Sequence, residues 1–347
     1  MIIQFIEQSF NNRNLEPDSA MSKKLRIVYP DADVGDDQHY KAIFSRLEAH
    51  CEFEIYTGRP EAEEEYIQRI KHADGVLLGW DMPKKVMAAA ANLRVISFTG
   101  VGVEKFIDLK QANDQNIVVC NCPGYSDNTV AEHTMGLLLA LARRLPVLDI
   151  STKNGEWTQP FDQIGFEGME LRGKTIGIIG FGGIGKRFSQ LCHAFGMEVL
   201  VWTRRLPTEN QLDFNVKFVE LEQLYNNSDI ISLHLAANPE TSNFIDQSAF
   251  EMMKSGVLLL NTARGELINE NALVAALKCG RVKGAAMDVF VNEPVTKYDP
   301  LTKLANVVLT PHIGYRTPES IDTLFGIGVD NLVSFFAGEP TNVVSLS

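Results

Sequence analysis

The sequence predicts an α/β protein with two parallel sheets in two domains, on three observations. Short apolar runs alternate with helix-like stretches along most of the 347 residues. A glycine hexad follows one of these runs near the middle of the chain, and an amphipathic stretch comes near its end. Such alternation is typical of βαβ units, which build parallel sheets. A chain of this length can bury two separate cores.

The first series of apolar runs predicts one α/β domain. Stretches with helical spacing, such as Tyr66, Ile67 and Ile70, separate the runs. Residues 1–20 are expected to form an irregular extension, with Met21 as an alternative start. The strands expected in this domain span residues 25–29, 53–56, 75–78, 95–98 and 117–119.

The second series predicts a larger sheet. It begins with an apolar helix expected over residues 130–145, and a loop-rich connection is expected over residues 151–173. Six strands with intervening helices match a doubly wound, Rossmann-type sheet. The six expected strands span residues 175–179, 199–202, 230–233, 257–260, 284–287 and 307–309.

The amphipathic stretch over residues 318–336 follows the completed second sheet. We expect it to return and pack on the first domain. The predicted organisation is therefore discontinuous: residues 1–123 and 316–347 form one domain, and residues 124–315 form a second domain inserted into it.

Composition narrows the functional classes. The net charge of −12 disfavours nucleic-acid binding and docking on anionic membranes. Five cysteines without a CxxC pair indicate reduced thiols in a cytoplasmic protein and no metal site. No apolar run reaches the roughly 18–20 residues of a membrane span.

The glycine hexad is Gly180-x-Gly182-x-x-Gly185, between a predicted strand and a predicted helix. In this context the first glycine permits a tight turn, the second lets the backbone approach a pyrophosphate, and the third lets helix and strand pack closely. The helix N-terminus adds its dipole to the phosphate site. The inserted domain is therefore predicted to bind a dinucleotide.

The residues after the next strand bear on which dinucleotide is bound. An acidic residue about 20 positions beyond the glycines usually holds the adenosine ribose. Here the strand runs into Thr203, Arg204 and Arg205, and no carboxylate stands nearby in the sequence. Guanidinium groups pair well with a 2′-phosphate. We therefore favour NADP(H) over NAD(H); alternatively, both arginines are solvated surface and NAD is held by backbone contacts.

Three residues of complementary chemistry lie near the ends of strand-like segments: Arg264, Glu293 and His312. Ligands of open α/β sheets bind beyond the carboxyl ends of strands. An arginine can fork onto a carboxylate, and a histidine can transfer a proton near neutral pH. A carboxylate can orient the imidazole. The set predicts hydride-transfer chemistry on a small acid.

Two other histidines are assigned supporting places. His133 is expected to be a packed or interface residue, and His234 is expected to line the cofactor cleft without reacting. Signatures of zinc hydrolysis (HExxH), serine hydrolysis (GxSxG) and P-loop chemistry do not occur in the sequence.

At these residues the chain resembles the D-isomer-specific 2-hydroxyacid dehydrogenases, which include phosphoglycerate dehydrogenase and glyoxylate/hydroxypyruvate reductases. The most specific segments are residues 171–185 and 253–294, within a similarity that runs over residues 21–344. The resemblance implies a flavodoxin-like substrate domain around the Rossmann-type one. It also implies that Arg264 binds and polarises a 2-oxo acid, that His312 is the acid/base, and that Glu293 supports His312.

The resemblance extends to substrate and cofactor contacts. The loop Gly100-Val101-Gly102 would hold the substrate carboxylate through backbone N–H groups, and Asp288 would face the nicotinamide carboxamide. The helix Val130–Arg144 would form the core of a homodimer interface. Together with the glycine loop and the two arginines, the expected cofactor contacts are Gly180, Gly182, Gly183, Ile184, Gly185, Thr203, Arg204, Arg205, Leu235, Thr262, Ala263, Asp288, His312 and Gly314.

One departure from the family pattern bears on the substrate. Phosphoglycerate dehydrogenases carry an Arg-Ser pair near the third strand of the first domain, where this chain has Gly79, Trp80 and Asp81. An indole and a carboxylate are poor phosphate partners, which favours an unphosphorylated acid such as glyoxylate or hydroxypyruvate, or a bulkier 2-oxo acid.

Three alternatives stay open: a phosphoglycerate dehydrogenase, a formate dehydrogenase and a nucleotide-sensing, corepressor-like binding protein. The formate enzymes carry a glutamine where Glu293 stands, which disfavours that reading. Corepressor-like relatives keep all three site residues, so only turnover separates them from enzymes.

Overall fold

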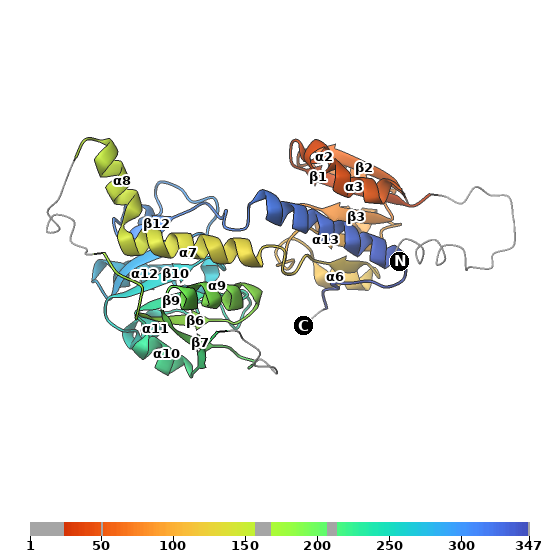
Figure 1. The fold of residues 1–347 in the computed structure, drawn as a ribbon. Coiled ribbons are helices and arrows are strands. Elements are labelled where there is room, and N and C mark those ends of the chain that lie inside the picture. The colour runs from red at the N-terminus through yellow and green to blue at the C-terminus, as the bar shows by residue number, and fades with distance from the viewer. Residues whose placement is uncertain (1–23, 50, 157–167, 207–213, 346–347) are drawn as a thin grey trace, which may run out of the picture. The chain divides into compact units, whose positions relative to one another are not determined.

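The computed structural model describes residues 24–49, 51–156, 168–206 and 214–345. The chain divides into two compact units, Met1–Tyr125 with Pro318–Ser347, and Ser126–Thr317 (Figure 1). Each unit contains one parallel sheet, of five and seven strands respectively. The predicted α/β fold class with two parallel sheets is confirmed. The extension expected over residues 1–20 lies outside the described residues.

The sheet of the first unit has the strand order β2-β1-β3-β4-β5. This is the flavodoxin-like order, in which the direction of winding reverses between β1 and β3. The apolar runs predicted from the sequence correspond to these strands: β1 (Arg26–Ala32), β2 (Glu52–Thr57), β3 (Gly75–Leu78), β4 (Val95–Phe98) and β5 (Val118–Cys120).

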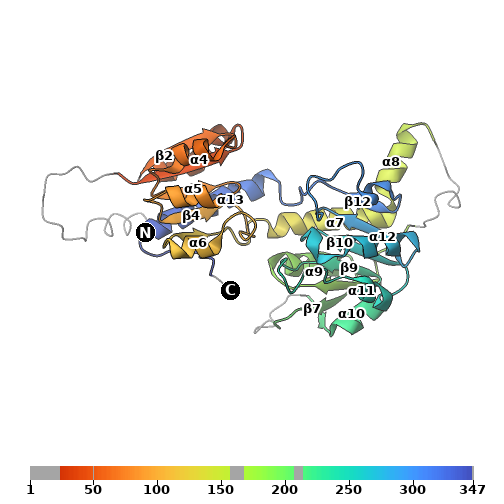
Figure 2. The same ribbon diagram turned by 180° about the vertical axis from the view of Figure 1, so that it is seen from behind.

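Helices cover both faces of this sheet, because alternate strand residues point to opposite sides. Val28 and Val76 face one helical layer, and Ile27 and Leu77 face the other. The C-terminal stretch, α13 (Pro318–Phe336), packs in the second layer (Figures 1 and 2). The remaining helices are α4 (Glu63–Ile70), α5 (Lys84–Ala89) and α6 (Leu109–Asp114) in the first layer, and α3 (Lys41–Glu48), preceded by α2 (Asp36–His39), in the second.

The sheet of the second unit has the order β12-β11-β10-β9-β6-β7-β8. Counted from β6, its first six strands follow the Rossmann order 3-2-1-4-5-6, and β12 extends the sheet by one. The six predicted strands are present, and β8 is an addition. The strands are β6 (Thr175–Ile179), β7 (Glu198–Trp202), β8 (Lys217–Phe218), β9 (Ile230–Leu233), β10 (Val257–Asn261), β11 (Val282–Met287) and β12 (Val307–Leu309).

This sheet also lies between two helical layers, each closing its own apolar cluster. Gly177 on β6 allows a close approach, since a Cβ there would overlap Leu224 of α10. Short 3-10 turns, η2 (Gly265–Leu267) and η3 (Pro300–Lys303), connect the later elements. One layer contains α7 (Asp127–Arg143) and α9 (Gly183–Ala194), and the other contains α10 (Leu221–Asn227), α11 (Gln247–Met252) and α12 (Glu270–Lys278).

A further helix, α8 (Leu145–Lys153), follows α7 directly and has no buried residue. It begins before the predicted loop-rich connection and includes its first three residues, whereas residues 157–167 lie outside the described part. In the described ranges, no helix is both long and apolar enough to cross a membrane.

A buried carboxylate joins the ends of β1 and β3 at the switch point of the first sheet. Asp31, at the end of β1, is 1% exposed. Its two oxygens accept hydrogen bonds from the backbone N–H groups of Gly79 (2.9 Å) and Trp80 (2.8 Å), which follow β3. Burial raises the pKa of Asp31 to about 6, although both N–H donors oppose the shift.

The raised pKa of Asp31 predicts a pH-dependent stability. The fold favours the protonated carboxyl, so its contribution is complete below the ordinary pKa near 4 and is lost as pH rises through about 6. Between pH 4 and pH 7, wild type should lose on the order of 2–3 kcal/mol of unfolding free energy relative to Asp31→Asn, which cannot titrate. Urea unfolding at several pH values measures this difference, and a constant difference would contradict the prediction.

Candidate active site

The glycine loop has the shape that a pyrophosphate site needs. Gly180 has φ +99°, and a Cβ there would overlap the carbonyl oxygen of His234. A Cβ at Gly185 would overlap the carbonyl oxygen of Gly180. At Gly182 a Cβ would meet no atom within 4 Å, so the space beside this one residue is open. Because α9 begins at Gly183, the N–H groups of its first turn have no partner within the helix, and such a helix end fits a dinucleotide phosphate. The carboxylate of Asp127 lies against Gly183, where a Cβ would overlap it.

His234 supports this loop from below. Its Nε2 lies 2.9 Å from the hydroxyl of Ser232, and its ring packs on Phe188. Burial lowers the pKa of His234 to about 3, so the imidazole is neutral at physiological pH. A buried neutral ring beneath the glycine turn is suited to packing rather than to proton transfer.

The structure brings His312 and Glu293 together. His312 Nδ1 lies 2.7 Å from Glu293 Oε2, and the other oxygen of Glu293 accepts the backbone N–H of Phe290 at 2.9 Å. A carboxylate held in this way selects the tautomer with hydrogen on Nδ1 and leaves Nε2 for proton exchange. The backbone of His312 has φ +52°, a left-handed conformation that is uncommon outside glycine and often found at functional sites.

Asp288 holds the turn that carries His312. This carboxylate is 2% exposed. It accepts the backbone N–H groups of Ile313 (3.0 Å) and Gly314 (2.8 Å) and the hydroxyl of Thr310 (2.5 Å). Burial alone would raise the pKa of Asp288, but hydrogen bonds from these groups and from His133 outweigh it and lower the pKa. Asp288 therefore stays ionised, with little free surface for the carboxamide expected to face it.

His133 of α7 joins the same network. Its Nε2 lies 3.1 Å from the Thr310 hydroxyl and 3.4 Å from Asp288 Oδ1. It was expected to be a packed or interface residue, and it is indeed largely covered, yet it packs on the turn of His312. No local motif signals this contact, because α7 and β12 are far apart in the sequence.

Arg264 lies on a neighbouring loop. Its carbonyl accepts the side-chain amide of Asn261 at 2.8 Å, and its Nη1 donates to the carbonyl of Ala263 at 2.7 Å. Among the described residues its guanidinium makes no hydrogen bond or ion pair with Glu293 or His312. The link between the two loops is through backbone, since a Cβ at Gly265 would overlap the peptide between Phe290 and Val291.

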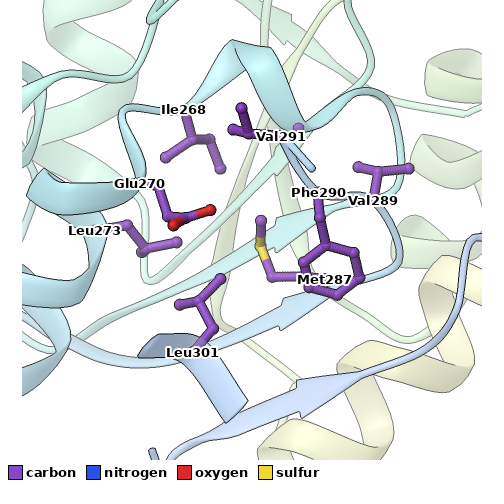
Figure 3. A pocket seen from close by; sticks show the side chains of 9 residues that line it. Ile268, Glu270, Leu273, Met287, Val289, Phe290, Val291 and Leu301 are labelled. Carbon is purple, nitrogen blue, oxygen red and sulfur yellow. The ribbon is translucent and has the colours of Figure 1, made fainter. Parts of the chain in front are cut away.

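A small hollow lies beneath these two loops. Glu270 is the charged residue of its lining, and Figure 3 shows the carboxylate among Leu273, Met287 and Leu301. Burial raises the pKa of Glu270, and the nearby charge of Asp299 adds to the shift. None of the three predicted catalytic residues lines the hollow. The hollow is therefore part of the packing beneath the loops.

Other expected cofactor contacts have constrained side chains. Thr262 is 8% exposed, and its hydroxyl lies 2.8 Å from that of Thr134 on α7. The N–H of Ala263 donates to Asn261 Oδ1 at 3.0 Å. Any contact from Thr262 to a cofactor would therefore come from its backbone. Leu235, which follows β9, lies next to the Gly180 turn.

At Arg204 the structure corrects one inference from the sequence. No carboxylate stands nearby in the chain, yet Arg204 Nη1 lies 2.9 Å from Oε2 of Glu240. Glu240 belongs to the loop after β9, 36 positions away. Linear spacing could not reveal this partner. Beside it, the hydroxyl of Thr203 donates to the carbonyl of Arg205 at 3.2 Å.

The predicted substrate loop lies in the first unit, just after β4. The backbone N–H of Gly100 donates to Phe98, and the Gly100 carbonyl accepts the N–H of Cys122 at 2.8 Å. The Val101 carbonyl accepts the side-chain amide of Asn121 at 2.8 Å. These bonds define the shape of the loop.

Known proteins resemble this chain in sequence and in fold. The family model "D-isomer specific 2-hydroxyacid dehydrogenase, NAD binding domain" matches residues 135–314, just over half of the chain. The chain is 37% identical over 301 residues to a glyoxylate reductase of Thermofilum pendens, covering 85% of this chain and 88% of that protein.

Two further relatives show the range of the similarity. A D-3-phosphoglycerate dehydrogenase of Archaeoglobus fulgidus is 38% identical over 298 residues, or 85% of this chain, and the chain spans only 55% of that longer protein. A solved acyclic imino acid reductase in complex with NADPH and D-Arg superposes with a TM-score of 0.81 at 30% identity, covering 92% of this chain and 100% of that one.

The match to an NAD-binding family model, on a Rossmann-type sheet, identifies the class: an NAD(P)-dependent oxidoreductase. Within that class, the chain belongs to the D-isomer specific 2-hydroxyacid dehydrogenase family.

The backbone contact at Gly265 predicts a large effect of one methyl group. In Gly265→Ala the Cβ would overlap the Phe290–Val291 peptide and separate the loops of Arg264 and Glu293. We expect kcat/KM to fall at least about tenfold, because small displacements of catalytic groups are costly. Steady-state kinetics and thermal unfolding measure both effects. Gly326→Ala, where a Cβ has open space within α13, is the control. Equal activity of the two variants would contradict the proposed role of the backbone contact at Gly265.

Proposed function

We propose that the protein reduces a small 2-oxo acid to the D-2-hydroxy acid with a nicotinamide cofactor. The observation that carries this proposal is the 2.7 Å pair of His312 and Glu293. Both residues follow neighbouring strands, β12 and β11, at the carboxyl edge where open α/β sheets bind ligands.

Each residue has a defined task in this reaction. The nicotinamide, when bound, supplies the hydride for the carbonyl carbon. His312 gives the proton on Nε2 to the carbonyl oxygen as negative charge develops there, and Glu293 stabilises the imidazolium before transfer. Arg264 pairs with the substrate carboxylate and polarises the carbonyl.

The substrate loop would add backbone donors for the same carboxylate. The N–H of Gly100 already donates to Phe98. This leaves the task to Val101, which is 46% exposed, and to Gly102. Backbone N–H groups at this position would fix the orientation of the acid without adding charge.

For the substrate we favour an unphosphorylated acid of the glyoxylate or hydroxypyruvate type, or a bulkier one. Trp80 and Asp81 stand where a phosphate-binding pair would be needed. The guanidinium carbon of Arg59, from the loop after β2, lies 3.3 Å from the centroid of the Trp80 ring, so a cation packs on this segment. Because that cation stacks on the indole beside Asp81, we do not assign it to a phosphate.

For the cofactor we favour NADP(H), on Arg204 and Arg205 at the end of β7. The similar imino acid reductase is described in complex with NADPH. The pyrophosphate would lie over Gly182, Gly183 and Ile184. Gly314, whose N–H is already bonded to Asp288, would border the nicotinamide through its backbone.

We propose a cytoplasmic homodimer through α7 and the helix that follows it. The five cysteines are free thiols, which suits a reducing compartment. Most apolar side chains of α7 are buried within its own unit. The exposed apolar residues lie on α8, namely Leu145, Val147, Leu148 and Ile150.

Removing the proposed acid tests the mechanism. In His312→Ala, reduction should fall by a factor of at least about 10² because proton donation is lost. Cofactor affinity, measured by titrating protein fluorescence without substrate, should change far less than turnover, because many other residues are expected to contact the cofactor. Turnover at the wild-type rate would eliminate the proposed role of His312.

A panel of 2-oxo acids with NADH and NADPH tests substrate and cofactor together. We expect the highest kcat/KM for an unphosphorylated acid with NADPH, and lower values for 3-phosphohydroxypyruvate. Higher values with NADH would refute the argument from Arg204 and Arg205. Negligible turnover of every acid, with tight cofactor binding, would favour a binding protein instead of an enzyme.

A further inference from the structure

We propose that Glu240 sets the cofactor preference by competing with the 2′-phosphate of NADPH for Arg204. The inference rests on the proposed function in one respect, namely that Arg204 meets the adenosine ribose. It adds a second residue, from another loop, whose charge opposes the phosphate.

The ion pair has the exposure of a reversible contact. Arg204 Nη1 and Glu240 Oε2 are 2.9 Å apart, and the two side chains are 57% and 79% exposed. Pairs of this kind contribute little to folding stability. A phosphate with up to two negative charges is a stronger partner for a guanidinium than one exposed carboxylate. Arg204 can therefore exchange Glu240 for a bound phosphate at low cost.

The backbone beneath Glu240 is fixed, so the carboxylate stays in reach of the ribose site. Asn238 Oδ1 accepts the backbone N–H groups of Glu240 (2.9 Å) and Thr241 (3.0 Å). The hydroxyl of Thr241, a residue 4% exposed, donates to the carbonyl of Ala236 at 2.8 Å. Only the side chain of Glu240 is free to move away from Arg204.

The end of β7, which carries Arg204, is fixed to the same segment. The rings of Trp202 and Phe244 pack with centroids 5.3 Å apart. This contact holds the strand end and the loop after β9 in register, with Arg204 and Glu240 facing each other. The backbone segments that carry the two charges are therefore held next to each other.

The two cofactors meet this pair differently. NADH has a 2′-hydroxyl and leaves Arg204 paired with Glu240. NADPH must displace Glu240 and then place its phosphate near the displaced carboxylate. Glu240 therefore lowers the affinity for NADPH and leaves that for NADH unchanged. The ratio of the two affinities is then smaller than it would be if Glu240 carried no charge.

The test is Glu240→Gln, which keeps the size of the side chain and removes its charge. We expect the Kd of NADPH to fall about two- to five-fold, the range that an exposed ion pair supports, and the Kd of NADH to stay unchanged. Binding is measured by calorimetry without substrate, so the result does not depend on turnover. The gain should shrink at high ionic strength because the charges are exposed.

Glu198→Gln is the matched control. Glu198 is the first residue of β7, at the end of the strand opposite to Arg204, and pairs with Lys217 at 3.6 Å. The variant changes the net charge by the same amount as Glu240→Gln. It should leave both Kd values unchanged. In Arg204→Gln, NADPH should bind more weakly, and adding Glu240→Gln should bring no further gain.

The outcomes separate this inference from the proposed NADP(H) preference. An unchanged NADPH affinity in Glu240→Gln, an equal gain in Glu198→Gln, or a gain that persists without Arg204 would overturn the role of Glu240. A further outcome is that wild type binds NADH more tightly than NADPH while Glu240→Gln still raises the affinity for NADPH alone. In that case the proposed preference fails and the role of Glu240 stands.

Discussion

The buried charge of Asp288 is the constraint on which the rest of the site depends. A carboxylate at 2% exposure is costly unless hydrogen-bond donors surround it. Here the donors come from the loop after β12 and from α7, so the ion pins both to the end of β11. His312 lies inside this arrangement with a left-handed backbone, which isolated peptides rarely adopt. The position of His312, the proposed proton donor, therefore depends on the hydrogen bonds that the neighbouring Asp288 carboxylate requires.

The other two site residues follow from sheet order. β10, β11 and β12 are adjacent in the sheet, and Arg264, Glu293 and His312 lie on the loops after them. Parallel strands bring these loops to one edge without a long connection. Backbone packing at Gly265 then holds the first loop against the second. A hydrogen bond from His312 to Glu293 joins the second to the third, so rigid elements position each group.

Much of the fold was predictable because central parallel strands are buried on both faces and read as apolar runs. Arg264, Glu293 and His312 could be proposed as site residues because polar residues after such runs stand out. β8 was missed, since two residues, Lys217 and Phe218, form no run. The contacts of His133 with Thr310 and of Glu240 with Arg204 join distant segments, and no spacing rule encodes such pairs.

The exposed helix α8 has a consequence for the proposed dimer. Nine residues without a buried side chain are fewer than an isolated helix needs to persist in water. Further contacts of its exposed Leu148 and Ile150 would therefore stabilise it. If a second copy supplies them, helix formation and association are a single equilibrium governed by mass action. Dilution would then unfold α8 before it affects either sheet, and the helix content would depend on the subunit concentration.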